Sequence, residues 1–231
     1  TSGGYKNFRI INNKVYDSYR SAITIATPDG GFIDNILIDS LYSYNTGNAI
    51  YLRIGARWNK GRTGSMSNIT IQNVYAEVSS TKPDAGYAYE GPIEDLPRNI
   101  SPSSIVGLPG QDITNVILRN IQIIYPGGSN PNYAYRGIKP DDLDSIPEMK
   151  SAYLEFSQLE EVPAWGFYIR HAKNITFENV TLTAKAKEYR PAIVLDDVKG
   201  ATFTRVKYND PVGRKRPLHV YKSPGIVQTK K

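Results

Sequence analysis

The chain has 231 residues, of which 40% are hydrophobic and 22% charged, so it is long enough to bury a core and too apolar to be disordered. Its formal net charge is +6, and it contains no cysteine, which excludes disulfides, thiolate zinc sites and cysteine nucleophiles. No apolar run approaches the ~18 residues of a membrane-spanning helix, so we expect no membrane insertion. The 15 Pro, 19 Gly and 17 Tyr favour β-structure.

One six-residue motif recurs along the chain: asparagine, apolar, any, apolar, any, and then asparagine or another polar residue. The alternation of apolar and polar residues predicts a short strand with one buried face. Successive copies are 28, 33, 47, 59 and 26 residues apart. The copies begin at Asn7, Asn35, Asn68, Asn115 and Asn174, and a degenerate copy begins at Gly200.

A second alternating run lies between successive motifs, and no helical pattern is long enough for a crossover helix. A unit of at least ~26 residues with two or more short strands predicts one rung of a parallel β-helix, with asparagine at the bends. An antiparallel β-sandwich with asparagine-rich turns is the alternative, although sandwiches rarely repeat one motif in one register. The second runs are residues 22–25, 49–54, 104–106, 166–169 and 192–195, with 218–221 closing the series.

The two longest intervals predict loop insertions at 76–102 and 125–164 in a single domain of about six rungs that covers residues 1–231. Insertions in solenoids emerge as loops and often build a binding face. Both insertions are rich in tyrosine and charged residues. They are therefore either parts of a binding face or solvated loops that their aromatic residues hold down.

Several segments together match the motifs of one known family. They are residues 30–36, 46–55, 64–74 and 163–171, with 83–87, 90–97 and 190–197 resembling a bacterial branch of it. On these residues the chain resembles glycoside hydrolase family 28, the polygalacturonases. That resemblance implies a right-handed parallel β-helix and inverting hydrolysis of pectic, uronic-acid-containing polysaccharide, without a metal or cofactor, in a secreted or periplasmic protein.

Members of this family carry an Asn-x-Asp segment, an Asp-Asp pair, a Gly-His-Gly segment and an Arg-Ile-Lys segment along one face. Arg53-Ile54-Gly55 matches the last of these at the arginine, with Gly55 in place of the lysine. Residues 18–23, where the histidine is expected, contain none, and the segments with Asp are expected upstream of Thr1. We therefore expect either the C-terminal part of a longer enzyme or a degenerate member without the usual acid and base.

Arginine is suited to binding an acidic polysaccharide because its planar guanidinium forms two parallel hydrogen bonds with a carboxylate. We expect four arginines to line up on one face near the strand ends. The two tryptophans, Trp58 and Trp165, lie near strand ends as well, where each either stacks on sugar or packs in the core. A histidine next to one arginine is a candidate proton carrier or an ordinary hydrogen-bonded residue. Solvated charges are the alternative for Arg20 and Arg170. The candidate substrate-binding residues are Arg20, Arg53, Arg57, Trp58, Arg170 and His171.

The catalytic residues are not identified by the sequence. An inverting glycosidase needs two carboxyl groups ~6.5–9.5 Å apart. The loop carboxylates Glu90, Glu94 and Asp95 are the best candidates because they lie in a long insertion, whereas turn residues such as Asp29 and the pair at 196–197 more often cap the backbone.

Three further interpretations remain open. The first is a non-catalytic glycan-binding protein on the same scaffold. The second is a pectate-lyase-like protein, for which Asp141, Asp142 and Asp144 are the closest acidic group to a calcium site. The third is self-association through an open N-terminal rung. Nucleic acid is not an expected partner, because the basic residues form no long block.

Overall fold

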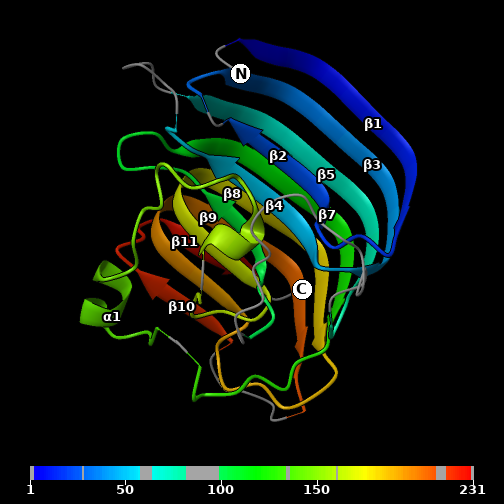
Figure 1. The fold of residues 1–231 in the computed structure, drawn as a ribbon, viewed down its shortest axis with the longest axis vertical. Helices are drawn as coiled ribbons and strands as arrows, with labels where there is room; N and C mark the ends of the chain where they lie inside the picture. Colours follow the sequence, from blue (N-terminus) through cyan, green and yellow to red (C-terminus); the bar gives the residue numbers. More distant parts are fainter. Residues whose placement is uncertain are drawn as a thin grey trace.

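The structure is a computed structural model, and it describes residues 3–27, 29–57, 64–81, 99–133, 136–159, 161–211 and 217–229. Its strands fall into a long set and a short set (Figure 1). The long strands are β1 (Gly4–Tyr16), β3 (Phe32–Thr46), β5 (Ser65–Val78), β7 (Ile113–Tyr125), β8 (Phe167–Ala184) and β9 (Ile193–Asn209). The short strands are β2 (Ser21–Thr27), β4 (Asn48–Ile54), β6 (Ser103–Val106), β10 (Leu218–Tyr221) and β11 (Ile226–Thr229).

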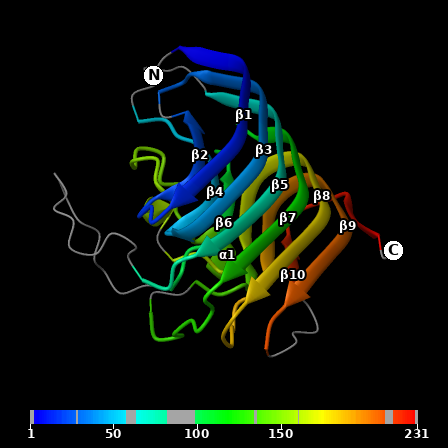
Figure 2. The ribbon, with the colours of Figure 1, turned by 90° about the vertical axis from the view of Figure 1, so that its right-hand side faces the viewer.

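Within the described ranges, all eleven strands belong to one sheet, and the paired strands are parallel. Its main path runs β1-β3-β5-β7-β8-β6-β4-β2, and β9 continues from β8 and pairs with β10 and β11. Figure 2 shows the long strands side by side in chain order from β1 to β9. Strand β8 joins the two sets because residues 167–170 pair with β6 and residues 172–184 pair with β7.

The predicted right-handed β-helix solenoid of about six rungs is wrong for this architecture. The path of eight parallel strands turns back at β8 until the sheet is nearly closed, so that β2 and β4 face the long strands across the core. Each long strand contains its own bends and so runs continuously from one face of the molecule to the next. The short alternating motifs do not reveal this continuity. The prediction of an all-β chain is confirmed.

Each long strand bends at the two ends of the repeated motif. In β5, for example, Asn68 and Asn73 have φ of 57° and 56°, in the left-handed region. Asparagine adopts this region more readily than most residues with a side chain. The amides also bond between strands: Asn115 donates to Asn68 Oδ1 at 2.9 Å, and Asn174 donates to Asn115 Oδ1 at 3.1 Å. The prediction of asparagine at the bends is confirmed.

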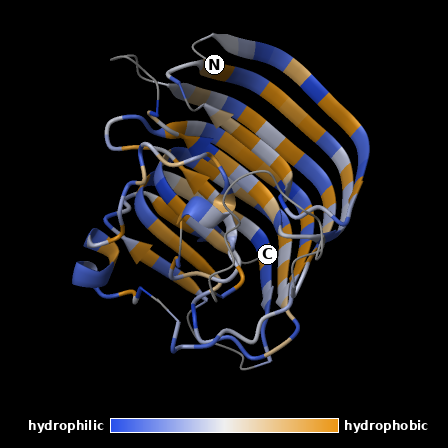
Figure 3. Cartoon of the chain, in the orientation of Figure 1, coloured by the Kyte–Doolittle hydropathy of each residue, from blue (hydrophilic) through white to orange (hydrophobic). Residues whose placement is uncertain are grey.

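The core lies between the two arms of the sheet. We call the long strands the long arm and the short strands the short arm. Apolar residues alternate with polar ones along the long strands, and Figure 3 shows the resulting bands. Ile36, Ile69, Val116 and Ile175 are paired in register on successive strands, and each is at most 2% exposed. They belong to one buried cluster with residues of the short strands such as Leu52. Burial of these aligned side chains is the main stabilising contribution to the fold.

The insertion predicted at 125–164 contains a helix, α1 (Pro140–Asp144), and a 3₁₀ helix, η1 (Phe156–Leu159). Neither helix is long and apolar enough to cross a membrane, and the same holds throughout the described part of the chain. Most of the insertion predicted at 76–102 lies outside the described residues.

A buried ionic cluster joins loop residues 99, 129, 161 and 188–190. Arg190 is 1% exposed, and its guanidinium contacts Glu188 at 3.1 Å and donates to Ser129 Oγ at 2.7 Å. Asn99 donates to Glu161 Oε1 at 2.7 Å in the same cluster. Because these groups satisfy one another away from solvent, we interpret the cluster as structural.

The N-terminal end of the sheet is exposed. Strand β1 pairs only with β3 among the described strands, and most of its side chains are exposed. An uncovered strand edge can pair with another chain. The expected self-association through this end stays a prediction.

We predict that replacing Phe177 will test the shared core. Phe177 is fully buried, stacks on Phe203 at a centroid distance of 4.9 Å and meets the edge of Phe167 at 5.2 Å. Phe177→Ala should lower the free energy of unfolding by about 3–5 kcal/mol in urea denaturation. The matched control Phe8→Ala removes a ring that is 53% exposed and should cost about 1 kcal/mol or less. Equal losses in the two variants would contradict this description of the core.

Candidate functional site

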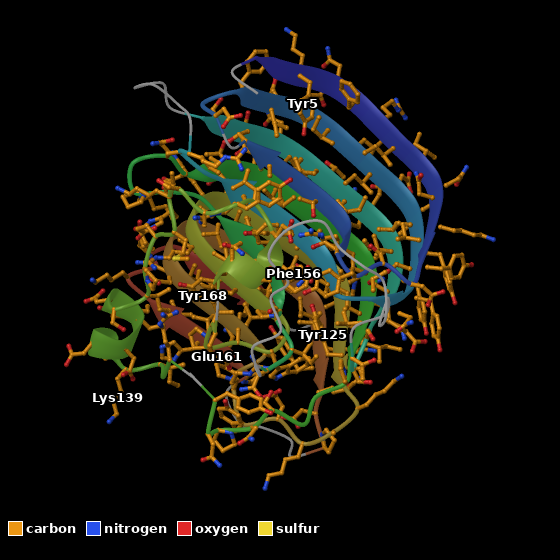
Figure 4. All side chains as sticks on the ribbon, viewed as in Figure 1. Tyr5, Tyr125, Lys139, Phe156, Glu161 and Tyr168 are labelled. Carbon is orange, nitrogen blue, oxygen red and sulfur yellow. The ribbon has the colours of Figure 1, made fainter. Side chains whose placement is uncertain are left out.

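Residues 136–159 cover the outer face of the short strands. Tyr51 of β4 and Tyr168 of β8 are each 1% exposed there and pack in one cluster with Leu143 and Phe156 of the covering segment. Figure 4 labels Phe156 and Tyr168 in this region. Strand β4 is therefore buried on both faces, which explains why its whole sequence is shielded from solvent.

Arg170 is the centre of a charged cluster at one end of this face. Its Nη2 lies 2.9 Å from Glu148 Oε1, and its Nε lies 3.3 Å from Asp196 Oδ2. Its Nη1 donates to the Ile146 carbonyl oxygen at 2.8 Å. The Tyr168 hydroxyl donates to the same Asp196 oxygen at 3.1 Å. One guanidinium thus joins a carboxylate of β9 to a carboxylate of the covering segment.

His171 extends the cluster on the other side of Glu148. Its Nδ1 lies 2.8 Å from Asp197 Oδ2, and its Nε2 lies 3.1 Å from Glu148 Oε1. Burial lowers the pKa of His171, but the hydrogen bonds to Glu148 and Asp197 outweigh it, and the pKa is raised above its usual value. The backbone at His171 has a φ of 48°, in the left-handed region, which marks the bend in β8 between its β6-paired and β7-paired parts.

The two carboxyl groups on Arg170 differ in their electrostatic environment. Burial raises the pKa of Asp196, and the charge of Arg170 only partly opposes this effect. Burial also acts to raise the pKa of Glu148, but the hydrogen bond to His171 and the charge of Arg170 outweigh burial and lower it. The pair therefore combines a carboxyl that retains its proton more readily with one that stays ionised. The sequence does not single out Glu148 as a catalytic or binding candidate, because it lies outside the repeat.

Arg53 lies on the same face and is 2% exposed. Its guanidinium donates to the main-chain carbonyl oxygens of Glu148, of Met149 at 3.2 Å and of Gly107 at 3.4 Å. Burial lowers the pKa of Arg53. In this structure Arg53 holds the covering segment, and its predicted role in substrate binding stays a prediction.

The other two predicted arginines lie nearer to solvent. Arg20 forms an ion pair with Glu155, and its side chain is 47% exposed. The guanidinium of Arg57 lies 5.2 Å from the ring centroid of Tyr153. All four arginines, at 20, 53, 57 and 170, thus contact residues 146–155, and the structure brings them together through this segment. The spacing of the repeat placed them on one face but did not indicate this shared partner.

Other predicted positions lie elsewhere. Trp165 is 2% exposed and meets Tyr125 edge to face at 5.8 Å, so it packs in the core. Asp29 forms an isolated bridge with Ala56. The candidates Trp58, Glu90, Glu94 and Asp95 lie outside the described residues.

The acidic residues of α1 have separate partners. Asp142 accepts a hydrogen bond from the Lys139 amide at 3.2 Å, whereas Asp144 binds Lys222 Nζ at 2.6 Å and the Tyr221 hydroxyl at 2.9 Å. Within the described ranges, no three His, Asp or Glu side chains come together to hold a metal ion.

Comparisons with protein-family models, curated proteins and solved structures gave no match to this chain. The resemblance to glycoside hydrolase family 28 therefore stays a prediction based on the sequence motifs.

We predict that His171 makes stability depend on pH. Its pKa in the folded state is raised, so its contribution is complete below the unfolded pKa of about 6.5 and is lost as the pH rises through the folded pKa. The facing charged groups are Glu148, Asp197 and Arg170. The loss of unfolding free energy caused by His171→Gln should therefore be larger at pH 6 than at pH 9, as measured by urea denaturation.

His219 provides a control of opposite sign, because burial lowers its pKa. Its protonation should destabilise the folded state as the pH falls below about 6.5, so His219→Gln should gain stability relative to the wild type at pH 5. If His171→Gln shows the same loss at both pH values, the proposed charge contacts do not act in solution.

Proposed function

We propose that this chain belongs to a glycoside hydrolase that cleaves uronic-acid-containing polysaccharide by an inverting mechanism. One observation carries the proposal: Arg170 holds Glu148 and Asp196 at 2.9 and 3.3 Å, and the pKa values of the two carboxyl groups are shifted in opposite directions. Glycosidases use two carboxyl groups whose environments separate their pKa values in this way.

The chemistry assigns a role to each group. Asp196, with its raised pKa, donates a proton to the leaving glycosidic oxygen, and Glu148, which stays ionised, accepts a proton from the attacking water. Glu148 Oε2 is buried and accepts no hydrogen bond within the described structure, so it keeps an unused acceptor for a water that enters with the substrate. The C–O bond breaks as water adds at the anomeric carbon, after which Glu148 releases its proton to solvent and Asp196 regains one from solvent.

Arg20 and Arg57 are suited to binding the substrate carboxylates on this face. Arg20 already holds the carboxylate of Glu155, and the Arg20 side chain remains 47% exposed. A substrate carboxylate would therefore replace Glu155 as the partner of Arg20. A neutral polysaccharide that displaced Glu155 would leave the Arg20 guanidinium without a charged partner. An acidic polysaccharide would supply one, so it is the favoured ligand.

A specific observation favours a second candidate, a non-catalytic glycan-binding protein. Asp196 is 3% exposed and Arg170 is 8% exposed, because residues 136–159 cover them. Access of a polysaccharide to Asp196 therefore requires the covering segment to move, and this movement would also shift Glu148, which belongs to the same segment. A binding protein would need no such displacement, because its ligand would contact only the exposed groups.

We predict that Asp196→Asn will separate the two candidates. With polygalacturonate as substrate, the full chain should release reducing ends, and Asp196→Asn should lower kcat by 100-fold or more with little change in KM, because only proton transfer is lost. The matched control Asp112→Asn removes a carboxylate that pairs with Lys199 on the surface and should retain activity.

Two results would contradict the assignment. A wild-type chain that binds polygalacturonate but releases no reducing ends would support the binding protein. Wild-type kcat in Asp196→Asn would show that the acid is another group.

A further inference from the structure

The outer face of the long strands carries a groove that is separate from the charged cluster of Arg170. It has a volume of about 610 Å³ and crosses β3, β5, β7 and β8 just after their second bend. Its lining comprises Ser40, Leu41, Tyr42, Asn73, Val74, Tyr75, Asn120, Ile121, Gln122, Asn179 and Thr181.

The parallel register aligns one outward-facing column of side chains along this groove. In order across the sheet, the column contains Lys14, Tyr42, Tyr75, Gln122, Thr181 and Lys207. We call these six residues the groove column. Because neighbouring strands are ~4.8 Å apart, the column extends about 24 Å, which is long enough for several sugar units.

Aromatic rings form the middle of the column. Tyr42 and Tyr75 are stacked, with a centroid distance of 5.3 Å and an interplanar angle of 11°, and Tyr16 adjoins Tyr42 at 5.8 Å. Tyr42 is 39% exposed and Tyr16 is 52% exposed. Exposed aromatic rings with polar tips suit a ligand that has both apolar faces and hydroxyl groups, as a sugar ring has.

Amide groups line the column on one side. Asn179 donates to Asn120 Oδ1 at 2.9 Å, and Asn120 donates to Asn73 Oδ1 at 3.1 Å. Each such amide has a second N–H beyond the one used in the ladder. The side chains of Gln122 and Thr181 add further donors and acceptors in the column itself. A row of hydrogen-bonding groups at the strand spacing fits a repetitive polymer better than a single small molecule.

The charges around the groove select the kind of polymer. Lys14 and Lys207 are exposed at the two ends of the column. Glu77 forms an ion pair with Lys185, whereas Asp39 accepts from the neutral amides of Asn73 and Gln72 and keeps its negative charge, which the two lysines outnumber. The two end lysines therefore complement a polymer that carries carboxylates along its length.

We propose that the groove column is a second polysaccharide-binding site, which holds a linear polymer of uronic acid units across the long strands. The acidic class of the ligand rests on the proposed function, whereas the stacking rings and amide ladder do not. The site lies on the outer face of the long arm, whereas the charged cluster lies on the outer face of the short arm. One part of a long polymer can thus stay bound at the groove column while another part contacts the charged cluster.

Binding of the full chain to polygalacturonate, measured by isothermal titration calorimetry, tests the proposal. Tyr42→Ala combined with Tyr75→Ala should weaken binding about tenfold, whereas Tyr42→Phe combined with Tyr75→Phe should retain it, because the rings remain. Lys14→Ala combined with Lys207→Ala should also weaken binding and reduce its dependence on salt. Tyr5→Ala, a similarly exposed tyrosine near the start of β1, is the control and should bind as the wild type does.

Cleavage of a galacturonic acid trimer distinguishes this proposal from the proposed function. The trimer is too short to occupy the whole column, so the tyrosine double variant should cleave it at the wild-type rate. If the wild type does not cleave the trimer, the proposed function fails, and the calorimetric measurement of polymer binding still tests the groove column. Unchanged polymer affinity in the tyrosine double variant, with thermal unfolding like that of the wild type, would overturn the second site.

Discussion

The left-handed corners of the long strands are the constraint on which the rest of the structure depends. Each long strand must turn twice within a few residues, and asparagine occupies most of these corners. Because the corners stack in register, every strand between them is forced to the same alternation of buried and exposed side chains. The apolar core and the outward-facing columns are therefore two results of one repeated turn.

The charged cluster of Arg170 depends on a different element. Residues 136–159 interrupt the repeat, pack on the short strands and supply Glu148 and Glu155 to the arginines of the sheet. The regular sheet fixes the arginines at its strand ends, and the irregular segment determines what they contact. This division explains how one face can hold both a buried structural arginine, Arg53, and an exposed one, Arg20.

The two outer faces of the sheet offer different chemistry. The short-strand face combines paired carboxylates, arginines and His171 beneath a covering segment, whereas the long-strand face combines stacked rings and an amide ladder in an open groove. Paired carboxylates with separated pKa values fit bond cleavage, and a row of rings and amides fits retention of a polymer. The two proposals thus assign different steps to different faces of one sheet.

The sequence by itself determined the all-β class, the positions of the repeated strands and the asparagine corners, because period-two alternation and left-handed propensity are local properties. It also placed Arg53 and Arg170 at aligned positions of the short strands and Arg57 just beyond β4, whereas Arg20 precedes β2 and lies at the opposite strand end. Only the tertiary structure decided that the sheet turns back at β8 and that Arg53 is buried. These features, like the partnership of Glu148 with Arg170 and His171 and the alignment of the groove column, join residues far apart in the chain, so no local pattern could specify them.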